Sequence, residues 1–279
     1  MAKKAGTKEA TKKVARKAPP PELQPLQVHL YDVQGKIVGT VDLPPVFATD
    51  LRTDLIRRAV TAFASNRRQP YGSAPRAGMR HSVRWSGKGQ GVSRVPRIRG
   101  TMIGAQAPGT VGGRQAHPPV TARIWGKKVN AKERRWARNA ALAAIRDPQV
   151  VGARGHRFSS KTTVPVVVQD ALEEIESVSE AVEFLEAVGV YDDVARAKAG
   201  VHVRQGRGKM RGRRFRRPRG PLLVVRDSAK VRQGFGNLPG VEVTTPAGLN
   251  AEVLAPGGDP GRLTIFSASA LEALRGWAA

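Results

Sequence analysis

No acidic residue occurs between Asp54 and Glu133, and this gap constrains the chain more than any other feature. Residues 66–128 inside it carry 13 Lys and Arg side chains together with 11 glycines and six prolines. Neither helical nor strand periodicity persists there, so the backbone needs hydrogen-bond partners outside the domain. A loop of this length is usually functional or disordered. We therefore expect residues 66–128 to form an extended arm.

The charge balance of the whole chain indicates an anionic partner. The 279 residues include 48 Lys and Arg against 22 Asp and Glu, which gives a net charge of +26. A compact domain with this excess repels itself unless something neutralises it. Nucleic acid is the commonest neutraliser, and an anionic membrane surface is the second candidate. Aromatic residues make up only 5% of the chain, so repeated base stacking is not the expected main binding mode.

The sequence gives little support for a membrane protein or for a function that depends on cysteine. The longest apolar runs, such as residues 164–168, fall far short of the roughly 20 residues that a membrane-spanning helix needs. The N-terminal residues lack the apolar core of a secretion signal, and we expect no membrane partner. The absence of cysteine excludes disulfides, Cys-type zinc sites and thiol catalysis, and it fits a reducing compartment.

The remaining residues predict a tail and a folded domain. Residues 1–25 are rich in Lys, Ala and Pro and predict a disordered basic tail. Residues 26–65 and 129–279 predict a single globular α/β domain. In its first part, apolar residues on both sides of Gln34-Gly35 predict a strand pair. A helix follows, with Thr53 as its cap and an apolar stripe from residue 55 to residue 63.

After residue 128, helix and strand signals alternate. Asn130 and Glu133 resemble a capping box for a helix that carries Trp136 on its apolar face and ends at Asp147-Pro148. Apolar strands are expected at residues 164–168, 222–225, 241–243 and 263–266. Helices are expected at residues 171–188, with a break and a second capping box at Ser177 and Glu180, after Ser228, near residue 250, and from Ser267 onward. This order predicts an α/β fold whose mainly parallel sheet of about four strands is flanked by helices.

A second basic loop interrupts this domain at residues 198–219, which hold ten basic residues and no acid. By contrast, residues 162–195 hold nine acids and no Lys or Arg. We expect these acids to give the helical cover of the sheet a negative outer face. That face should point away from the nucleic acid.

Motifs typical of enzymes lack the context that they need. The stretch from Gly87 to Gly91 has glycine at alternate positions, but no strand precedes it and no amphipathic helix follows, as a dinucleotide-binding turn requires. No two of the five histidines have metal-ligand spacing, and His117 is interpreted as a packing or RNA-contact residue. We expect no cofactor, no metal site, no small-molecule substrate and no catalytic residue, and we do not expect an enzyme.

The two basic loops carry the strongest functional signal. Arginine donates two parallel hydrogen bonds to a phosphate and stacks on bases, glycine lets the backbone approach closely, and proline stiffens the chain. The mixture suits an arm that threads among irregular RNA helices and orders on binding. A plain disordered cationic linker is the open alternative. The candidate RNA-binding residues are Arg67, Arg68, Arg76, Arg80, Arg84, Lys88, Arg94, Arg97, Arg99, Arg114, His117, Arg123, Lys127, Lys128, Arg204, Arg207, Lys209, Arg211, Arg213, Arg214, Arg216 and Arg217.

Several stretches together resemble the ribosomal protein L four family of the large subunit, in its archaeal form. They are residues 43–47, 52–59, 66–72, 86–91, 113–119, 130–145, 164–168, 211–218 and 255–266. The run from Gly113 to Pro119 and the second basic loop resemble the archaeal and eukaryotic branch more than the bacterial one. The length of the chain resembles that of archaeal members.

The resemblance implies a structural constituent of the large ribosomal subunit, in the cytoplasm, that binds large-subunit rRNA and supports subunit assembly. It also implies an arm that reaches the wall of the polypeptide exit tunnel, with its tip between residues 84 and 104. The tunnel-lining residues would be Arg94, Val95, Pro96, Arg97, Ile98 and Arg99. The partners would be rRNA, neighbouring large-subunit ribosomal proteins and, at the tip, the nascent polypeptide.

Two other classes of protein remain open on the sequence. A nucleic-acid-modifying enzyme built on an α/β sheet needs a clustered set of acids, bases or metal ligands, and the sequence shows none. A DNA-compacting architectural protein would bind duplex DNA as well as RNA and would usually be small or dimeric. A long internal arm fits folded RNA better than a uniform duplex.

Overall fold

The computed structural model describes residues 24–277 and has a main sheet of six strands in the order β2-β1-β5-β10-β8-β9. These strands are β1 (Gln27–Tyr31), β2 (Ile37–Asp42), β5 (Val166–Val168), β8 (Leu222–Val224), β9 (Glu242–Thr244) and β10 (Thr264–Ser267). Every neighbouring pair is parallel except β1 and β2, which form an antiparallel hairpin. The predicted α/β class with a mainly parallel sheet is confirmed.

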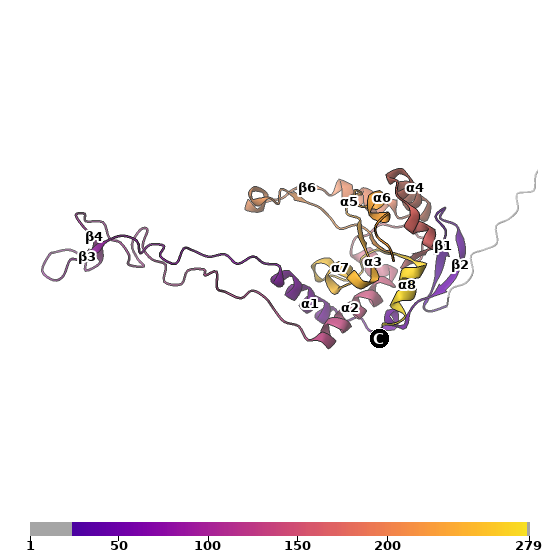
Figure 1. The fold of residues 1–279 in the computed structure, drawn as a ribbon, viewed down its shortest axis with the longest axis horizontal. Coiled ribbons are helices and arrows are strands. Elements are labelled where there is room, and N and C mark those ends of the chain that lie inside the picture. Colours follow the sequence, from indigo (N-terminus) through magenta and orange to yellow (C-terminus); the bar gives the residue numbers. More distant parts are fainter. Residues whose placement is uncertain (1–23, 278–279) are drawn as a thin grey trace, which may run out of the picture.

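Helices flank this sheet within the described residues (Figure 1). They are α1 (Thr53–Asn66), α2 (Ala131–Ile145), α3 (Pro148–Ala153), α4 (Val178–Val188), α5 (Tyr191–Ala199), α6 (Val231–Phe235), α7 (Ala251–Leu254) and α8 (Ala268–Leu274). Short 3-10 turns lie at Pro45–Ala48, Asp170–Glu174, Arg207–Arg211, Pro246–Gly248 and Pro256–Gly258. None of the helices in residues 24–277 combines the length and the apolar character that crossing a bilayer demands.

The sheet is wider than the predicted four strands because the N-terminal hairpin joins it. Leu30 of β1 pairs with Val167 of β5 in parallel register, so the predicted strand pair becomes one edge of the main sheet. The hairpin turn needs glycine, since Gly35 has a φ of +70° and a Cβ there would lie 2.3 Å from the carbonyl oxygen of Ala187. The predicted basic tail lies outside the described residues, apart from residues 24 and 25.

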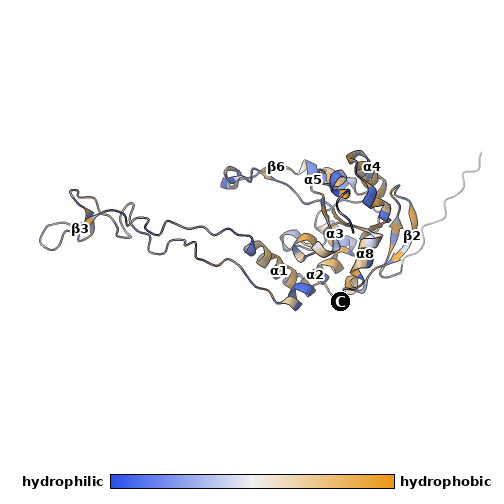
Figure 2. Cartoon of the chain, in the orientation of Figure 1, coloured by the Kyte–Doolittle hydropathy of each residue, from blue (hydrophilic) through white to orange (hydrophobic). Residues whose placement is uncertain are grey.

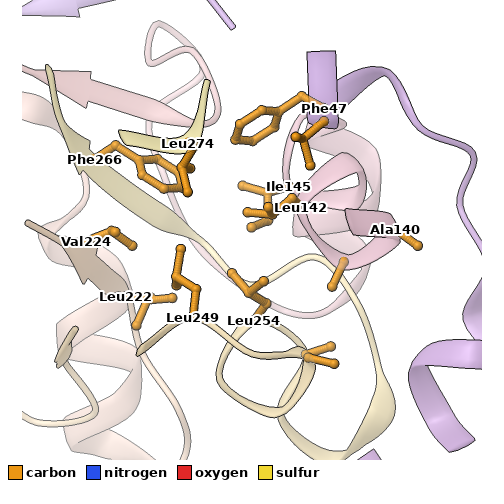
Figure 3. Close-up of a cluster of buried hydrophobic side chains, with 14 of the residues drawn as sticks. Phe47, Ala140, Leu142, Ile145, Leu222, Val224, Leu249, Leu254, Phe266 and Leu274 are labelled. Atoms are coloured by element: carbon orange, nitrogen blue, oxygen red, sulfur yellow. The ribbon is translucent and has the colours of Figure 1, made fainter. Parts of the chain in front are cut away.

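The central strands are buried on both faces, which explains their continuous apolar sequence. Val167 and Leu222 pack into one cluster with side chains of α1, α2, α7 and α8. Their neighbours Val166 and Leu223 point to the opposite face and pack with α4, α5 and α6. Figure 3 shows the first cluster, in which side chains of α2 meet those of the strands. The first of these cores contains the buried residues of α1 and α2 and so positions the helix ends from which the arm leaves.

Helix caps follow the sequence prediction in part. The last helix starts at Ser267 as predicted, and the Ser267 side chain caps it, because its Oγ accepts a hydrogen bond from the backbone N–H of Ala270 at 3.2 Å. Asn130 and Ser177 also occupy the N-cap positions of α2 and α4, but neither side chain makes the expected capping hydrogen bond. The positions of these two helix starts were therefore correct and the predicted capping interactions were wrong.

Two other helix boundaries differ from the prediction, and the predicted end of α2 at Asp147-Pro148 is confirmed. Thr53 is the first residue of α1 and Arg52 is its N-cap, so Thr53 does not cap that helix. Asp147 does more than end α2, because its side chain caps α3. The short helix after residue 228 begins later than expected, with Lys230 and not Ser228 at its N-cap.

The buried face of α2 excludes Trp136, contrary to the prediction. Its side chain is 57% exposed, whereas Ala137, Ala140 and Leu142 are buried. Small alanine side chains on this face allow α2 to lie close against α1, whose buried residues include Ile56 and Ala59. The apolar stripe predicted for α1 is confirmed at its centre.

Candidate nucleic-acid interface

Residues 67–130 leave the domain at the end of α1 and return to it at the start of α2 (Figure 1). This range holds two short strands, β3 (Val83–Trp85) and β4 (Pro96–Ile98), near its far end. The outgoing and returning limbs touch at intervals. The backbone N–H of Lys127 donates to Asn66 Oδ1 at 2.8 Å, and the N–H of Ser73 donates to the carbonyl oxygen of Pro119 at 3.0 Å. These contacts hold the limbs side by side without a continuous ladder.

One close approach of the two limbs requires glycine. Gly78 has a φ of +74°, and a Cβ at this position would lie 2.5 Å from the carbonyl carbon of Gly113 on the other limb. Real Cβ atoms do not approach backbone this closely, so any side chain at residue 78 would force the limbs apart. The abundant glycines of the sequence thus include one that determines how the limbs pack.

Four side chains stack where the arm joins the domain. The guanidinium carbons of Arg68 and Arg123 lie 3.7 Å and 4.3 Å from the centroid of the Trp125 ring. The Tyr71 ring stacks nearly parallel to Trp125, with centroids 6.3 Å apart and planes 10° apart. Each cation lies at a distance where the ring quadrupole attracts it. The cluster joins the outgoing limb to the returning limb and fixes two positive charges at the root of the arm.

At the outer end, the strands β3 and β4 pair antiparallel and place Arg84 opposite Arg97. Arg97 turns back onto its own segment, because its guanidinium donates to Ser93 Oγ at 3.1 Å and to the carbonyl oxygen of Met102. Arg94 and Arg99 are exposed. Of the three arginines predicted for the tip, Arg97 therefore shapes the backbone while the other two face solvent.

The structure leaves most of the predicted RNA-binding side chains accessible. Arg97 and Arg204 are half-buried, and the others of the predicted set are exposed. Arg67 is exposed but forms an ion pair with Glu252 of α7, so part of its charge is compensated by the domain. Whether these residues contact RNA stays a prediction, and their accessibility is compatible with it.

The second basic loop is a small hairpin. The strands β6 (His202–Val203) and β7 (Phe215–Arg216) pair antiparallel, and the turn Arg207–Arg211 forms the tip. Arg204 ties the two limbs together, since its Nε donates to the carbonyl oxygen of Arg213 at 3.2 Å. Figure 1 shows that this loop and the arm project from the same side of the domain. The tip of the loop is hydrophilic (Figure 2).

Exposed apolar side chains gather on both basic segments, and sequence reasoning missed them. On the arm they are Tyr71, Met79, Trp85, Met102, Ile103, Val111, Val120 and Ile124, and on the second basic loop they are Val201, Val203, Met210 and Phe215. Within residues 24–277, the other large exposed apolar side chains are Ile37, Val38, Leu51, Trp136 and Val178. Such a concentration marks a surface that a partner covers. The sequence did contain a signal for these exposed side chains. An aromatic residue inside an acid-free, glycine-rich loop has no core in which it could be buried.

The acids of residues 162–195 have more than one role. Asp170, Glu174, Glu176, Glu180, Glu183, Glu186 and Asp192 are exposed, and Figure 1 shows α4 on the side of the domain opposite to the arm. Glu173 is half-buried and accepts the backbone N–H of Arg226 at 2.7 Å and the hydroxyl of Ser267 at 2.7 Å. Asp193 is fully buried, so the negative outer face is real but smaller than predicted.

The glycine-rich stretch from Gly87 to Gly91 lies between β3 and β4 on the arm. It is exposed, and β4 follows it where a nucleotide-binding turn would place a helix. Within residues 24–277, no three His, Cys, Asp or Glu side chains are grouped so that they could hold a metal ion.

Comparisons with known proteins agree with this architecture. The model of the ribosomal protein L4/L1 family matches residues 41–277. A large ribosomal subunit protein uL4 of Thermoplasma acidophilum is 43% identical over 249 residues, which cover 89% of this chain and 97% of that protein. The large ribosomal subunit protein uL4 of Methanothrix thermoacetophila is 47% identical over 249 residues, which cover 89% of this chain and 98% of that protein. A third relative of the same name, from Methanococcoides burtonii, is 44% identical over 248 residues.

Proposed function

The chain belongs to the ribosomal protein L4/L1 family, and we propose that it binds large-subunit rRNA through the arm and the second basic loop. As a member of this family it is a structural constituent of the large ribosomal subunit in the cytoplasm, and it is not an enzyme. Its partners include rRNA and neighbouring ribosomal proteins. The resemblance noted in the sequence is confirmed.

One observation carries the proposal. The arm and the second basic loop project from the same side of the domain, and both combine exposed cations with exposed apolar side chains. Guanidinium groups bind phosphates, and exposed aromatic and apolar side chains suit unpaired bases or ribose. Residues 26–65 and 129–279 act as the globular domain that anchors these segments, and residues 66–128 act as the RNA-binding arm.

The part of the arm nearer the domain, here called the root, and the tip of the arm have different roles. The exposed cations Arg68, Arg114, Lys127 and Lys128 belong to the limbs near the domain or midway along the arm, and they contact rRNA and are needed for incorporation into the subunit. The tip, residues 94–99, lines the polypeptide exit tunnel and borders the nascent chain. A tip with water on one side makes fewer phosphate contacts. It therefore affects the passage of the nascent chain through the tunnel more than it affects subunit assembly.

Incorporation into subunits tests the root. Replacement of Arg68, Arg114, Lys127 and Lys128 by Gln together should reduce the fraction of chain that co-sediments with large subunits after a high-salt wash. The matched control replaces Lys36, Lys161, Arg226 and Lys230 by Gln, since these are exposed cations outside the arm and the second basic loop. Equal incorporation of the two variants would contradict the proposal.

Cross-linking tests the tip. A photoreactive amino acid in place of Arg99 should cross-link to a stalled nascent chain in translating ribosomes. The same probe in place of Arg76, which is exposed nearer the domain, should cross-link to rRNA instead. Deletion of residues 92–102 should leave subunits assembled. If this deletion is excluded from subunits while the root variant enters normally, the arm is oriented the other way.

A further inference from the structure

A cleft of 560 Å³ lies where the second basic loop joins the domain, between α3, α5 and the turn at residues 256–260. Arginines from separate segments line it, namely Arg154 after α3, Arg196 of α5, and Arg216, Arg217 and Arg219 at the end of the loop. Asp259 is the single carboxylate among the lining residues. The cleft therefore gathers positive charge from parts of the chain that are distant in sequence.

Neutral carbonyl groups hold two of these arginines in place. Arg154 donates to the carbonyl oxygens of Pro256, at 2.7 Å, and of Asp259. Burial lowers the pKa of Arg154 and the charge of Arg196 lowers it further, while Asp259 acts in the opposite direction. Arg196 donates through Nη2 to the carbonyl oxygen of Arg219 at 2.7 Å. A carbonyl oxygen orients a guanidinium group without cancelling its charge.

A buried arginine shares a carboxylate with Arg219 of the cleft. Arg262 is fully buried, and its Nη1 donates to Glu242 Oε2 at 2.9 Å. Its Nη2 is buried with no hydrogen-bond partner. Burial lowers the pKa of Arg262, Glu242 acts in the opposite direction, and the charges of Arg219 and Arg154 lower it further.

The carboxylates nearby are already shared. Glu242 Oε2 accepts from Arg262 and also from Arg219, the latter at 3.2 Å. Asp193 accepts from Arg196 Nε at 2.8 Å and from His156. The Asp259 side chain is mostly exposed, and its Oδ1 lies 3.5 Å from Nη2 of Arg57, a residue that does not line the cleft. Cations that are fixed close together, with too few carboxylates between them, are stabilised by an added anion.

We propose that this cleft binds one phosphate group, and that in the subunit it is a phosphodiester of the rRNA backbone. The inference rests on the proposed RNA-binding function and names a site for it. The planar fork of Arg217 or Arg219 donates two parallel hydrogen bonds to such a group. A phosphate held here clamps the root of the second basic loop to α3 and α5, so the loop leaves the domain in a fixed direction.

Inorganic phosphate tests the cleft in the full-length chain without RNA. Thermal unfolding is followed as phosphate replaces chloride at constant ionic strength, because a ligand of the folded state raises Tm in a saturable way. The double variant Arg216→Gln, Arg217→Gln should weaken the apparent phosphate affinity at least fivefold. Its matched control, Arg226→Gln with Lys230→Gln, removes the same charge from exposed positions outside the cleft and outside the basic segments and should keep the affinity. Equal weakening in both variants, or equal stabilisation by acetate, overturns the proposal.

The complex with rRNA distinguishes the source of the phosphate. If an rRNA phosphodiester fills the cleft, inorganic phosphate should no longer stabilise the wild-type chain once it is bound to rRNA. Continued stabilisation would show that the cleft takes free phosphate and would overturn the assignment to rRNA. A chain that binds phosphate in the first experiment but does not bind rRNA at all would instead contradict the proposed function, so the two failures differ.

Discussion

The Nδ1 of His156 donates to Oδ2 of Asp193 at 2.9 Å, and both side chains are buried. The other carboxylate oxygen accepts from the backbone N–H of Arg157 at 3.0 Å and from Arg196 Nε at 2.8 Å. Burial would raise the pKa of Asp193, but the hydrogen bonds from His156 and Arg196 outweigh it and hold the pKa below its ordinary value. The carboxylate therefore ties α5 to the segment after α3.

Replacement of Asp193 by Asn should destabilise the domain by about 3–5 kcal/mol at pH 7, because it removes one partner from a buried charged network. The folded-state pKa of Asp193 is depressed, so its contribution is present above the unfolded pKa of about 4 and is lost as pH falls through the folded pKa. Urea unfolding at pH 7 and below pH 4 measures the free energy of unfolding of the wild-type chain and of the Asp193→Asn variant. The difference between these two free energies should be smaller below pH 4 than at pH 7. The control Asp192→Asn alters an exposed neighbour and should change stability by about 0.5 kcal/mol or less. Equal stability of the two variants at pH 7 would contradict the role given to Asp193.

The core of α2 offers a second test. Leu142 is fully buried in the cluster of Figure 3, and Leu142→Ala should cost about 2–5 kcal/mol through lost burial and the cavity left behind. Trp136→Ala on the same helix removes a larger side chain that is 57% exposed, and it should cost about 0.5 kcal/mol. Denaturant unfolding measures both. A larger loss for the Trp136 variant would mean that Trp136 belongs to the core after all.

The approach of the two limbs of the arm can be tested with a pair of glycines. Gly78 and Gly87 both have positive φ, but only at Gly78 would a Cβ meet the opposite limb, while at Gly87 it would meet nothing within 4 Å. Alanine at either position carries a similar backbone cost of about 1–2 kcal/mol. Only Gly78→Ala should force the limbs apart, so it should weaken equilibrium binding to large-subunit rRNA more than Gly87→Ala does. Equal binding by the two variants would show that the limb packing does not matter for RNA recognition.

Local signals in the sequence predict most of the domain. The runs that became β5, β8 and β10 are mainly apolar because these strands are buried on both faces. The edge strand β9 is only half-buried and contains Glu242. The start of the last helix at Ser267 could be predicted because the signal for a helix start spans only a few residues. The place of β1 in the sheet could not be predicted, since the Leu30–Val167 pairing joins residues far apart in the chain.

The positions of the arm and of the second basic loop could be predicted from the sequence, but the contacts of their individual side chains could not. Charge and glycine content identified the arm and the second basic loop. The ion pair of Arg67 with Glu252 and the inward turn of Arg97 depend on tertiary contacts that no local pattern reveals. Exposed Trp85 and Phe215 were missed because an aromatic residue in a sequence indicates a core until its surroundings are known.

The most direct test of the account is the salt dependence of rRNA binding by the full chain and by a variant whose residues 67–130 are replaced by a short glycine linker. The contact between Lys127 and Asn66 indicates that such a linker can join α1 to α2. Each phosphate that a cation neutralises releases counterions, so log K should fall linearly and steeply with log salt for the full chain. The armless variant should show a clearly shallower slope, with its domain still folded. An unchanged slope would contradict it, because the arm would then not carry the phosphate contacts.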